Sequence, residues 1–191
     1  MSRIIAGRAK GHRLSTPKGA RTRPTTDRTR EALFSALSSW FNSVDSDASA
    51  HLAGVSVLDL FAGSGAVGLE AASRGAAPVV LVEQDRPTAR LIQDNARATG
   101  LSVEVVAARA EAVAGAPGRA FDLIFLDPPY EMATESIEIL LEKLAVTALA
   151  GRGLVVVERS SRDRDPSWPP RYTDTWLRRY GETTLHFGAV D

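Results

Sequence analysis

Short apolar segments alternate with helical segments along most of this 191-residue chain, and this alternation limits the folds that the chain can adopt. Apolar segments rich in Val, Leu and Ile predict strands at 55–60, 79–83, 103–107, 121–126 and 153–158. The segments between them predict helices at 65–74, 87–99, 110–114 and 133–146. Short connections and right-handed crossovers favour a mainly parallel sheet with helices on both faces.

The C-terminal segment completes the predicted sheet. After a Pro-rich loop, residues 172–180 and 183–190 are separated by Gly181-Glu182, which predicts an antiparallel hairpin. The expected fold class is therefore α/β, with a mainly parallel seven-stranded sheet that carries a C-terminal antiparallel hairpin. Ligands of such sheets bind at the carboxyl ends of the strands.

Positive charge is concentrated near the N-terminus, although the net charge of the chain is zero. Residues 1–30 hold nine of the 23 Lys and Arg residues and one acid, so this stretch carries +8 and residues 31–191 carry −8. Such a stretch is typical of proteins that contact nucleic-acid phosphates, and the alternative is a solvated tail. The candidate nucleic-acid contacts are Arg3, Arg8, Lys10, Arg13, Lys18, Arg21, Arg23 and Arg28.

The basic stretch also carries signals of local structure. Apolar residues on either side of Gly7 and Gly11 favour two short strands over a featureless tail. From Thr25 to Phe41, a capping threonine, an early acid and an apolar stripe predict a helix, and residues 42–51 predict a linker. We therefore expect a basic N-terminal extension over 1–50 and a ligand-binding domain over 51–191. We also expect residues 1–20 to be dispensable for the fold.

Composition argues against several classes of protein. The chain has no cysteine, and its three histidines lie too far apart in sequence to suggest a metal site. The N-terminus lacks the apolar core of a signal peptide, and no apolar run approaches the ~20 residues that a membrane helix needs. We expect a soluble, cytoplasmic monomer without a metal.

The first of two motifs is a strand followed by a glycine turn, at 57–65. Its pattern G-x-G-x-x-G at 63–68 also fits a dinucleotide site, but a buried acid at Asp59 would repel the pyrophosphate of a dinucleotide. The same acid would attract the ammonium and sulfonium of S-adenosylmethionine. Glu83 fits the ribose of either cofactor, and each acid could instead be a simple cap or a surface acid. A P-loop is excluded, because no Gly-Lys-Ser/Thr follows the glycines.

The second motif is Asp127-Pro128-Pro129-Tyr130, directly after the apolar run 121–126. It offers a carboxylate, carbonyls and a flat ring, which fit a planar base with an exposed amine. Asp127 and the Pro128 carbonyl can hold the amine hydrogens so that the nitrogen lone pair faces a methyl donor. Tyr130 can stack on a nucleobase that has left its stack in the nucleic acid. The alternative is that Tyr130 is an aromatic residue of the protein core. Together the two motifs resemble S-adenosylmethionine-dependent methyltransferases that act on exocyclic amines of nucleobases.

Aspartate at position 127 favours guanine over adenine. Guanine presents N1–H and the N2 amine side by side, and one carboxylate can accept both hydrogens. The adenine edge pairs a donor with an acceptor, and a carboxylate would be repelled by adenine N1.

The chain resembles the RsmD family of bacterial 16S rRNA (guanine-N2)-methyltransferases. The resemblance spans most of the chain, and the segment RPTTDRTREALF at 23–34 is its most specific part; the other matching segments are 3–7, 11–14, 58–65, 69–71, 73–76 and 121–130. It implies a Rossmann-like S-adenosylmethionine-dependent methyltransferase domain over 51–191. It also implies a substrate guanine in a hairpin loop of 16S rRNA, within the 30S subunit or an assembly intermediate. The basic residues named above then become candidate RNA contacts.

The resemblance also implies which residues bind the cofactor. Arg109 departs from the expected pattern, because an acidic or amide residue is common there and a guanidinium cannot accept a hydrogen bond. The adenine could be held by backbone groups near Ala110, or Arg109 could point to solvent. A methyltransferase for DNA adenine or another RNA, and a non-catalytic rRNA-binding assembly factor, remain alternatives. The predicted cofactor-binding residues are Asp59, Phe61, Ala62, Gly63, Ser64, Gly65, Glu83, Gln84, Arg109 and Ala110, and the predicted catalytic residues are Asp127, Pro128, Pro129 and Tyr130.

Overall fold

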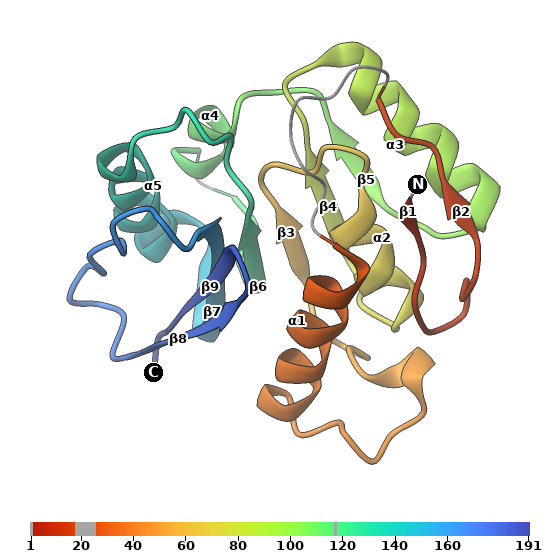
Figure 1. Ribbon diagram of the computed structural model, residues 1–191, viewed down its shortest axis with the longest axis horizontal. Helices are drawn as coiled ribbons and strands as arrows, with labels where there is room; N and C mark the ends of the chain where they lie inside the picture. The colour runs from red at the N-terminus through yellow and green to blue at the C-terminus, as the bar shows by residue number, and fades with distance from the viewer. Residues whose placement is uncertain (1, 18–25, 117) are drawn as a thin grey trace.

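The structure, a computed structural model, describes residues 2–17, 26–116 and 118–191. Within these residues a seven-stranded sheet has the order β5-β4-β3-β6-β7-β9-β8 (Figure 1). The strands β3 to β7 run parallel to one another, and β9 lies antiparallel between β7 and β8. The strands are β3 (Val57–Asp59), β4 (Val79–Val82), β5 (Glu104–Val106), β6 (Phe121–Leu126), β7 (Leu149–Ser160), β8 (Asp174–Tyr180) and β9 (Thr183–Ala189).

The predicted α/β fold with a C-terminal hairpin is confirmed. Most boundaries differ from the prediction by one or two residues, and the largest difference is at β7, which begins at Leu149 and not at 153. Its pairing with β6 shifts register beyond Phe121, in the region where Arg152 adopts a positive φ of 65°. Such an irregularity interrupts the alternation of side chains that marks a strand in sequence, which explains why the first residues of β7 were not predicted.

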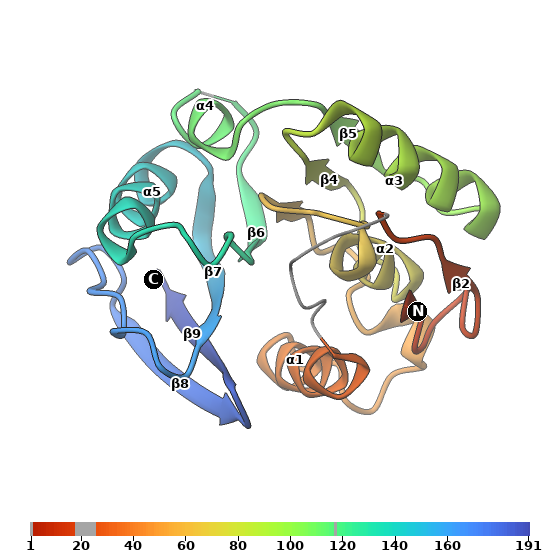
Figure 2. The same cartoon turned by 45° about the horizontal axis from the view of Figure 1, so that its top comes forward.

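Helices cover both faces of the sheet, as expected. They are α1 (Asp27–Trp40), α2 (Ala66–Ser73), α3 (Arg86–Thr99), α4 (Ala110–Ala114) and α5 (Thr134–Thr147). Figure 2 shows α4 and α5 on one side of the central strands and α1, α2 and α3 on the other. Successive residues of β6 alternate between two buried clusters, since Phe125 packs with α1 to α3 while Ile124 packs with α4 and α5. None of the helices in the described residues is both long and apolar enough to cross a membrane.

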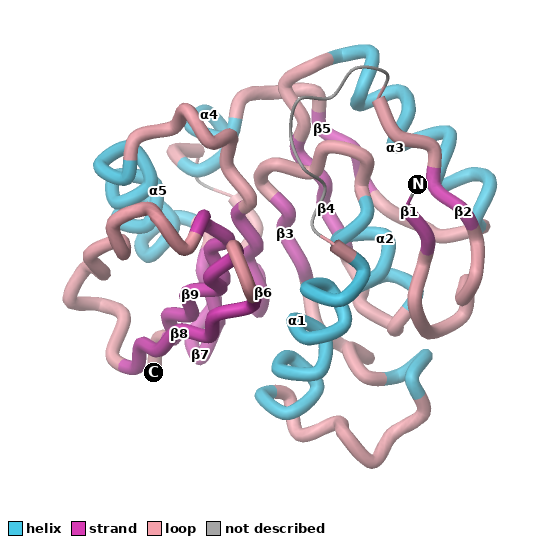
Figure 3. Tube along the Cα trace, viewed as in Figure 1, coloured by secondary structure: helices cyan, strands magenta, loops and turns pink. Residues whose placement is uncertain are grey.

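The N-terminal stretch has the predicted local structure. The strands β1 (Ser2–Arg3) and β2 (Arg13–Leu14) pair antiparallel apart from the main sheet (Figure 3). Thr26 caps α1, where its side chain accepts a hydrogen bond from the Thr29 amide at 3.2 Å. The expected linker at 42–51 contains one short 3-10 helix, η1 (Ala48–Ala50), and is otherwise irregular.

This stretch packs against the rest of the protein. Ile4, Ala9 and Leu14 are buried in the same cluster as the apolar side chains of α1 and α2. The buried carboxylate of Glu70 in α2 accepts hydrogen bonds from the Ile5 amide at 2.7 Å and the Ala6 amide at 3.0 Å. Removal of residues 1–20 would leave that carboxylate with fewer partners and expose apolar surface. The contacts therefore argue against the expectation that these residues are dispensable for the fold.

Arg30 links α1 to β1 through hydrogen bonds to Ser2 and Arg3. Among the described residues it is the largest fully buried side chain, with 0% of its surface exposed. Its guanidinium donates to the Ser2 hydroxyl at 2.9 Å, to the Arg3 carbonyl and to Asp27 at 3.0 Å. Arg30 therefore has a structural role within the RPTTDRTREALF segment.

Candidate active site

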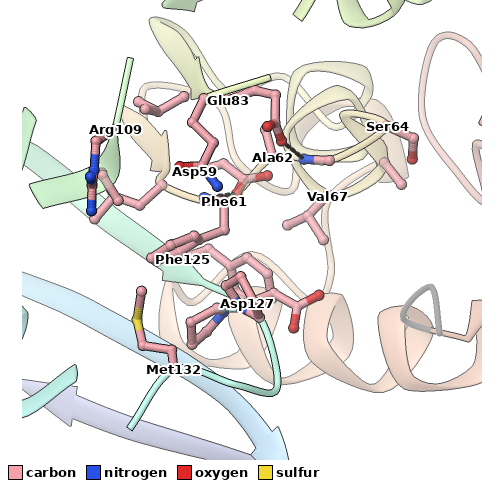
Figure 4. A pocket seen from close by; sticks show the side chains of 18 of the residues that line it. Asp59, Phe61, Ala62, Ser64, Val67, Glu83, Arg109, Phe125, Asp127 and Met132 are labelled. Atoms are coloured by element: carbon pink, nitrogen blue, oxygen red, sulfur yellow. Dashed lines mark hydrogen bonds between the residues drawn. The ribbon is translucent and has the colours of Figure 1, made fainter. Parts of the chain in front are cut away.

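One pocket of about 350 Å³ lies at the carboxyl ends of β3, β4 and β6, where the topology of a parallel sheet is expected to place a ligand. Side chains from all three strand ends and from the loops that follow them line it (Figure 4). Of the predicted cofactor and catalytic residues, Gly65 alone is absent from its lining. The predicted residues that line the pocket are Asp59, Phe61, Ala62, Gly63, Ser64, Glu83, Gln84, Arg109, Ala110, Asp127, Pro128, Pro129 and Tyr130.

Gly65 shapes the glycine turn from behind the pocket. It caps α2 in the left-handed conformation, with φ of 81°, where glycine is favoured because it lacks a Cβ. A Cβ at this position would lie 2.9 Å from Cγ2 of Ile92 in α3. The turn can therefore pack closely on α3 while its preceding residues face the pocket.

Asp59 ends β3 at the floor of the pocket. Only 1% of this residue is exposed, and the backbone amides of Phe61, at 3.4 Å from Oδ1, and of Gly68 interact with its carboxylate. Burial raises the pKa of Asp59 from 3.8 to about 7, and the nearby carboxylates of Asp127 and Glu83 add to the increase. A positive charge in the pocket would stabilise the ionised form, whereas a pyrophosphate would not.

Glu83 follows β4 on the other side of the glycine turn. Its Oε2 accepts from the Gly63 amide at 3.0 Å and its Oε1 from the Asp85 amide at 2.8 Å. Each carboxylate oxygen can accept a second hydrogen bond, so Glu83 retains capacity for ligand hydroxyls. Glu83 therefore holds the turn in place and lines the pocket at the same time.

The segment 127–130 forms the opposite wall. Pro128 is buried and Asp127 is partly buried, while 57% of Tyr130 is exposed. The alternative interpretation of Tyr130 as a core aromatic is therefore wrong. Figure 4 shows Asp127 and Met132 on the side of the pocket opposite Glu83. A flat ring at the solvent-facing edge is open to a base that arrives from outside.

Arg159, at the end of β7, supports this wall from behind. Its buried guanidinium donates to the Met132 carbonyl at 3.0 Å and, at 3.5 Å, to the Pro129 carbonyl. It also forms an ion pair with Asp163 at 2.8 Å. These contacts fix the loop that follows Asp127, and no local sequence pattern pointed to them.

Arg109 occupies the position that departed from the expected pattern. Its side chain is 74% exposed, and its Nε lies 3.4 Å from Oε2 of Glu111. The Arg109 side chain therefore points to solvent at the rim of the pocket, which is compatible with an adenine held by backbone groups near Ala110.

The chain matches one protein family over nearly its whole length. The family described as "Conserved hypothetical protein 95" matches residues 2–189. The chain is 36% identical to Ribosomal RNA small subunit methyltransferase D of Escherichia coli (strain K12), over 90% of this chain and 81% of the relative. It belongs to the RsmD family. A protein of the same name from Haemophilus influenzae is 32% identical over 90% of this chain and 84% of its own length.

Solved structures resemble this RsmD family member along its whole length. The Escherichia coli protein yhhF superposes with a TM-score of 0.83 at 29% identity, over 100% of this chain and 98% of that one. A hypothetical protein of Thermus thermophilus gives a TM-score of 0.78 at 35% identity, over 98% of each chain. A 16S rRNA N2 G1207 methyltransferase solved with AdoMet and guanosine shares the fold, with a TM-score of 0.72 at 22% identity over 91% of this chain and 45% of that one.

Several pocket residues of this family member were not predicted from its sequence. Thr16 and Pro17 come from the N-terminal stretch, and Phe125 and Met132 flank the second motif. Phe125 could have been predicted as a pocket residue, because it is bulky and lies one position before the end of β6. No local sequence pattern marks Thr16 or Pro17. The other lining residues not predicted are Leu60, Ala66, Val67, Val82, Ala108 and Glu111.

The candidate RNA contacts that fall within the described residues lie outside the pocket. Lys10, Arg13 and Arg28 are not part of its lining, and Lys10 and Arg13 are exposed. Arg3 pairs with Asp27 at 3.4 Å, and Arg8 donates to the Ala72 carbonyl at 3.1 Å, so both also hold the N-terminal stretch in place. The remaining candidates, Lys18, Arg21 and Arg23, fall outside the described residues.

Proposed function

We propose that this protein transfers a methyl group from S-adenosylmethionine to the N2 amine of a guanine in a hairpin loop of 16S rRNA. The observation that carries the proposal is one pocket with two different walls. A buried acid and a glycine turn suit the cofactor on one side, and Asp127 to Tyr130 suit an amine on a planar base on the other. The membership of the RsmD family and the names of its relatives support the same reaction.

The residues around Asp59 fit S-adenosylmethionine better than a dinucleotide. A carboxylate whose pKa is raised by burial gains stability when a cation enters the pocket. Glu83 and the glycine turn would hold the ribose and the amino-acid part, and the backbone near Ala110 would contact the adenine. When bound, the cofactor supplies a methyl group on a positively charged sulfur, which is a reactive electrophile.

The second wall would orient the nucleophile. The guanine amine is a weak nucleophile, because its lone pair is delocalised into the ring. Asp127 and the Pro128 carbonyl would accept its hydrogens, so that the lone pair points at the methyl carbon and the positive charge that develops on nitrogen is stabilised. A nitrogen–carbon bond then forms as the carbon–sulfur bond breaks, and the nitrogen releases a proton to solvent. Tyr130 would stack on the flipped base, a contact worth ~1–3 kcal/mol.

Two regions of the chain would take part in binding the RNA substrate. The exposed basic residues of 1–50 would contact phosphates, and residues 51–191, together with Thr16 and Pro17, would bind the cofactor and the target base. The substrate would be 16S rRNA within the 30S subunit or an assembly intermediate. The protein would act as a cytoplasmic monomer and would need no metal ion.

The test uses 30S subunits from a strain that lacks this gene. The wild type, Asp127→Asn and Glu131→Gln are incubated with these subunits and labelled methyl donor, and the modified nucleotide is mapped. Glu131 is exposed and lies four residues after Asp127, so Glu131→Gln is the matched control for loss of an acid. We expect methylation of one guanine at N2 by the wild type and the control, and loss of turnover without loss of cofactor affinity for Asp127→Asn.

Other outcomes would select the alternatives. Methylation of DNA adenine or of a different RNA would change the assigned substrate. Cofactor binding without transfer to any of these substrates would favour an assembly factor that retains the fold. An Asp127→Asn variant that keeps most of its rate would contradict the role given to Asp127.

A further inference from the structure

The N-terminal stretch contributes directly to the wall of the pocket. Thr16 and Pro17 line it together with the glycine-turn residues Gly63 and Ser64. Only Ser15 separates Thr16 from the end of β2, and β2 carries the exposed basic side chain of Arg13. The candidate RNA-binding stretch and the candidate cofactor site are therefore continuous in the chain and adjacent in space.

Asn95 in α3 holds the two parts together. Its Oδ1 accepts a hydrogen bond from the Ser15 amide at 2.9 Å, and its Nδ2 donates to the Ser15 carbonyl at 3.0 Å. The same Nδ2 donates to the carbonyl of Ser64 in the glycine turn, also at 3.0 Å. One side-chain amide thus bonds both backbone groups of Ser15 and one backbone group of the turn.

These bonds constrain position because the amide is buried. Only 4% of Asn95 is exposed, so water cannot easily replace a bond that is lost. An amide group presents an acceptor and two donor hydrogens, and all of them are used here. Neither aspartate, which lacks the donors, nor leucine, which lacks both, can hold Ser15 and Ser64 together. Displacement of residues 15–17 would remove part of the wall and release the turn on one side.

We propose that Asn95 is a positioning residue that builds residues 15–17 into the cofactor site and thereby couples cofactor binding to RNA binding. This inference rests on the proposed function of the pocket. A cofactor that contacts Thr16 and Pro17 stabilises the docked position of this segment, in which Arg13 and Lys10 are presented at a fixed place. By linkage, RNA held on those side chains must strengthen cofactor binding by the same factor.

The experiment compares Asn95→Leu with Gln93→Leu, which removes an exposed amide from the same helix. For each variant and the wild type, the dissociation constant of S-adenosylhomocysteine is measured by calorimetry. The affinity for unmethylated 30S subunits is measured with and without saturating S-adenosylhomocysteine, and the melting temperature is recorded. In the wild type and the Gln93→Leu control, we expect S-adenosylhomocysteine to raise affinity for the subunits roughly 5- to 30-fold. In Asn95→Leu, this ratio falls close to one and cofactor affinity drops by a similar factor.

A second variant keeps the inference testable if Asn95→Leu does not fold. The double substitution Thr16→Ala and Pro17→Ala removes side chains from the wall and leaves the buried bonds of Asn95 intact. We expect this variant to melt within a few degrees of the wild type and to bind S-adenosylhomocysteine more weakly. A folded Asn95→Leu protein with unchanged coupling, or a double variant with unchanged cofactor affinity, would overturn the inference. A wild type that binds no S-adenosylhomocysteine would instead overturn the proposed function, and the inference with it.

Discussion

Protonation of Asp59 should control both the stability of the free protein and its affinity for the cofactor. Burial raises the pKa of this carboxyl from 3.8 to about 7. Between these two values the folded protein keeps a proton that the unfolded chain has lost. The free energy of unfolding of the free protein therefore falls as the pH rises from about 4 to about 7. The difference between the two pKa values corresponds to a loss of about 4 kcal/mol in the free energy of unfolding over this pH range.

The bound cofactor should lower the pKa of Asp59 again, because it places a cation beside the carboxylate. This removes the loss of stability at neutral pH. Binding then releases a proton, about 0.8 per cofactor at pH 6.5 if the pKa is about 7 in the free protein. The affinity for S-adenosylmethionine should rise about 15-fold between pH 5.5 and 7.0 by the same relation. Above pH 7.0 the affinity no longer follows Asp59 alone, because an α-amino group such as that of the cofactor loses its own proton with a pKa of about 7.7.

Calorimetry in buffers with different ionisation enthalpies measures the proton release directly. Asp59→Asn should bind more weakly, release no proton over this range and show a smaller fall of stability with pH. Glu111→Gln is the control, because a hydrogen bond from its own backbone amide lowers the pKa of that pocket acid. Glu111 is therefore ionised throughout the range, and its loss should leave the proton release unchanged. Wild-type binding that is independent of pH and releases no proton would refute the reasoning about Asp59.

Three further predictions concern packing and charge. Gly7→Ala should destabilise the protein by ~1–3 kcal/mol more than Gly11→Ala. Both glycines have a positive φ, but a Cβ at Gly7 would lie 2.0 Å from the Ser73 carbonyl oxygen, whereas a Cβ at Gly11 would meet nothing within 4 Å. Equal melting temperatures of the two variants would contradict the docking of the N-terminal stretch. Arg159→Met should lower kcat by up to ~100-fold with little change in cofactor affinity, because the loop after Asp127 loses the hydrogen bonds of the guanidinium. The control Arg162→Met, at an exposed arginine, should be neutral. Wild-type kcat in Arg159→Met would refute this role. The double variant Lys10→Ala and Arg13→Ala should keep the fold and bind RNA more weakly. The slope of log K for RNA binding against log salt concentration should fall by ~0.7–0.9 for each phosphate contact removed. An unchanged slope would show that these side chains are only solvated.

Strand and helix order could be predicted from the sequence, because the periodicity of apolar residues depends on local geometry. The same order located most of the pocket. Asp59, Glu83 and Asp127 lie at or just after strand ends, and parallel strands bring such residues to one edge of a sheet whatever the details of packing. Residues that follow directly from strand position were therefore found without the structure.

The tertiary structure alone decided which distant residues support that edge. Asn95 meets Ser15 across 80 residues, and Arg159 meets Met132 across 27. Neither contact can be recognised from the periodicity of the sequence, because a single buried polar residue cannot be told from a solvent-facing one by its local pattern. The basic charge of the N-terminal stretch was visible in the composition, but its docking on Glu70 depends on one carboxylate that faces two backbone amides after folding. Local patterns determine which segments form strands and helices, whereas the partners of buried polar groups depend on how those segments pack.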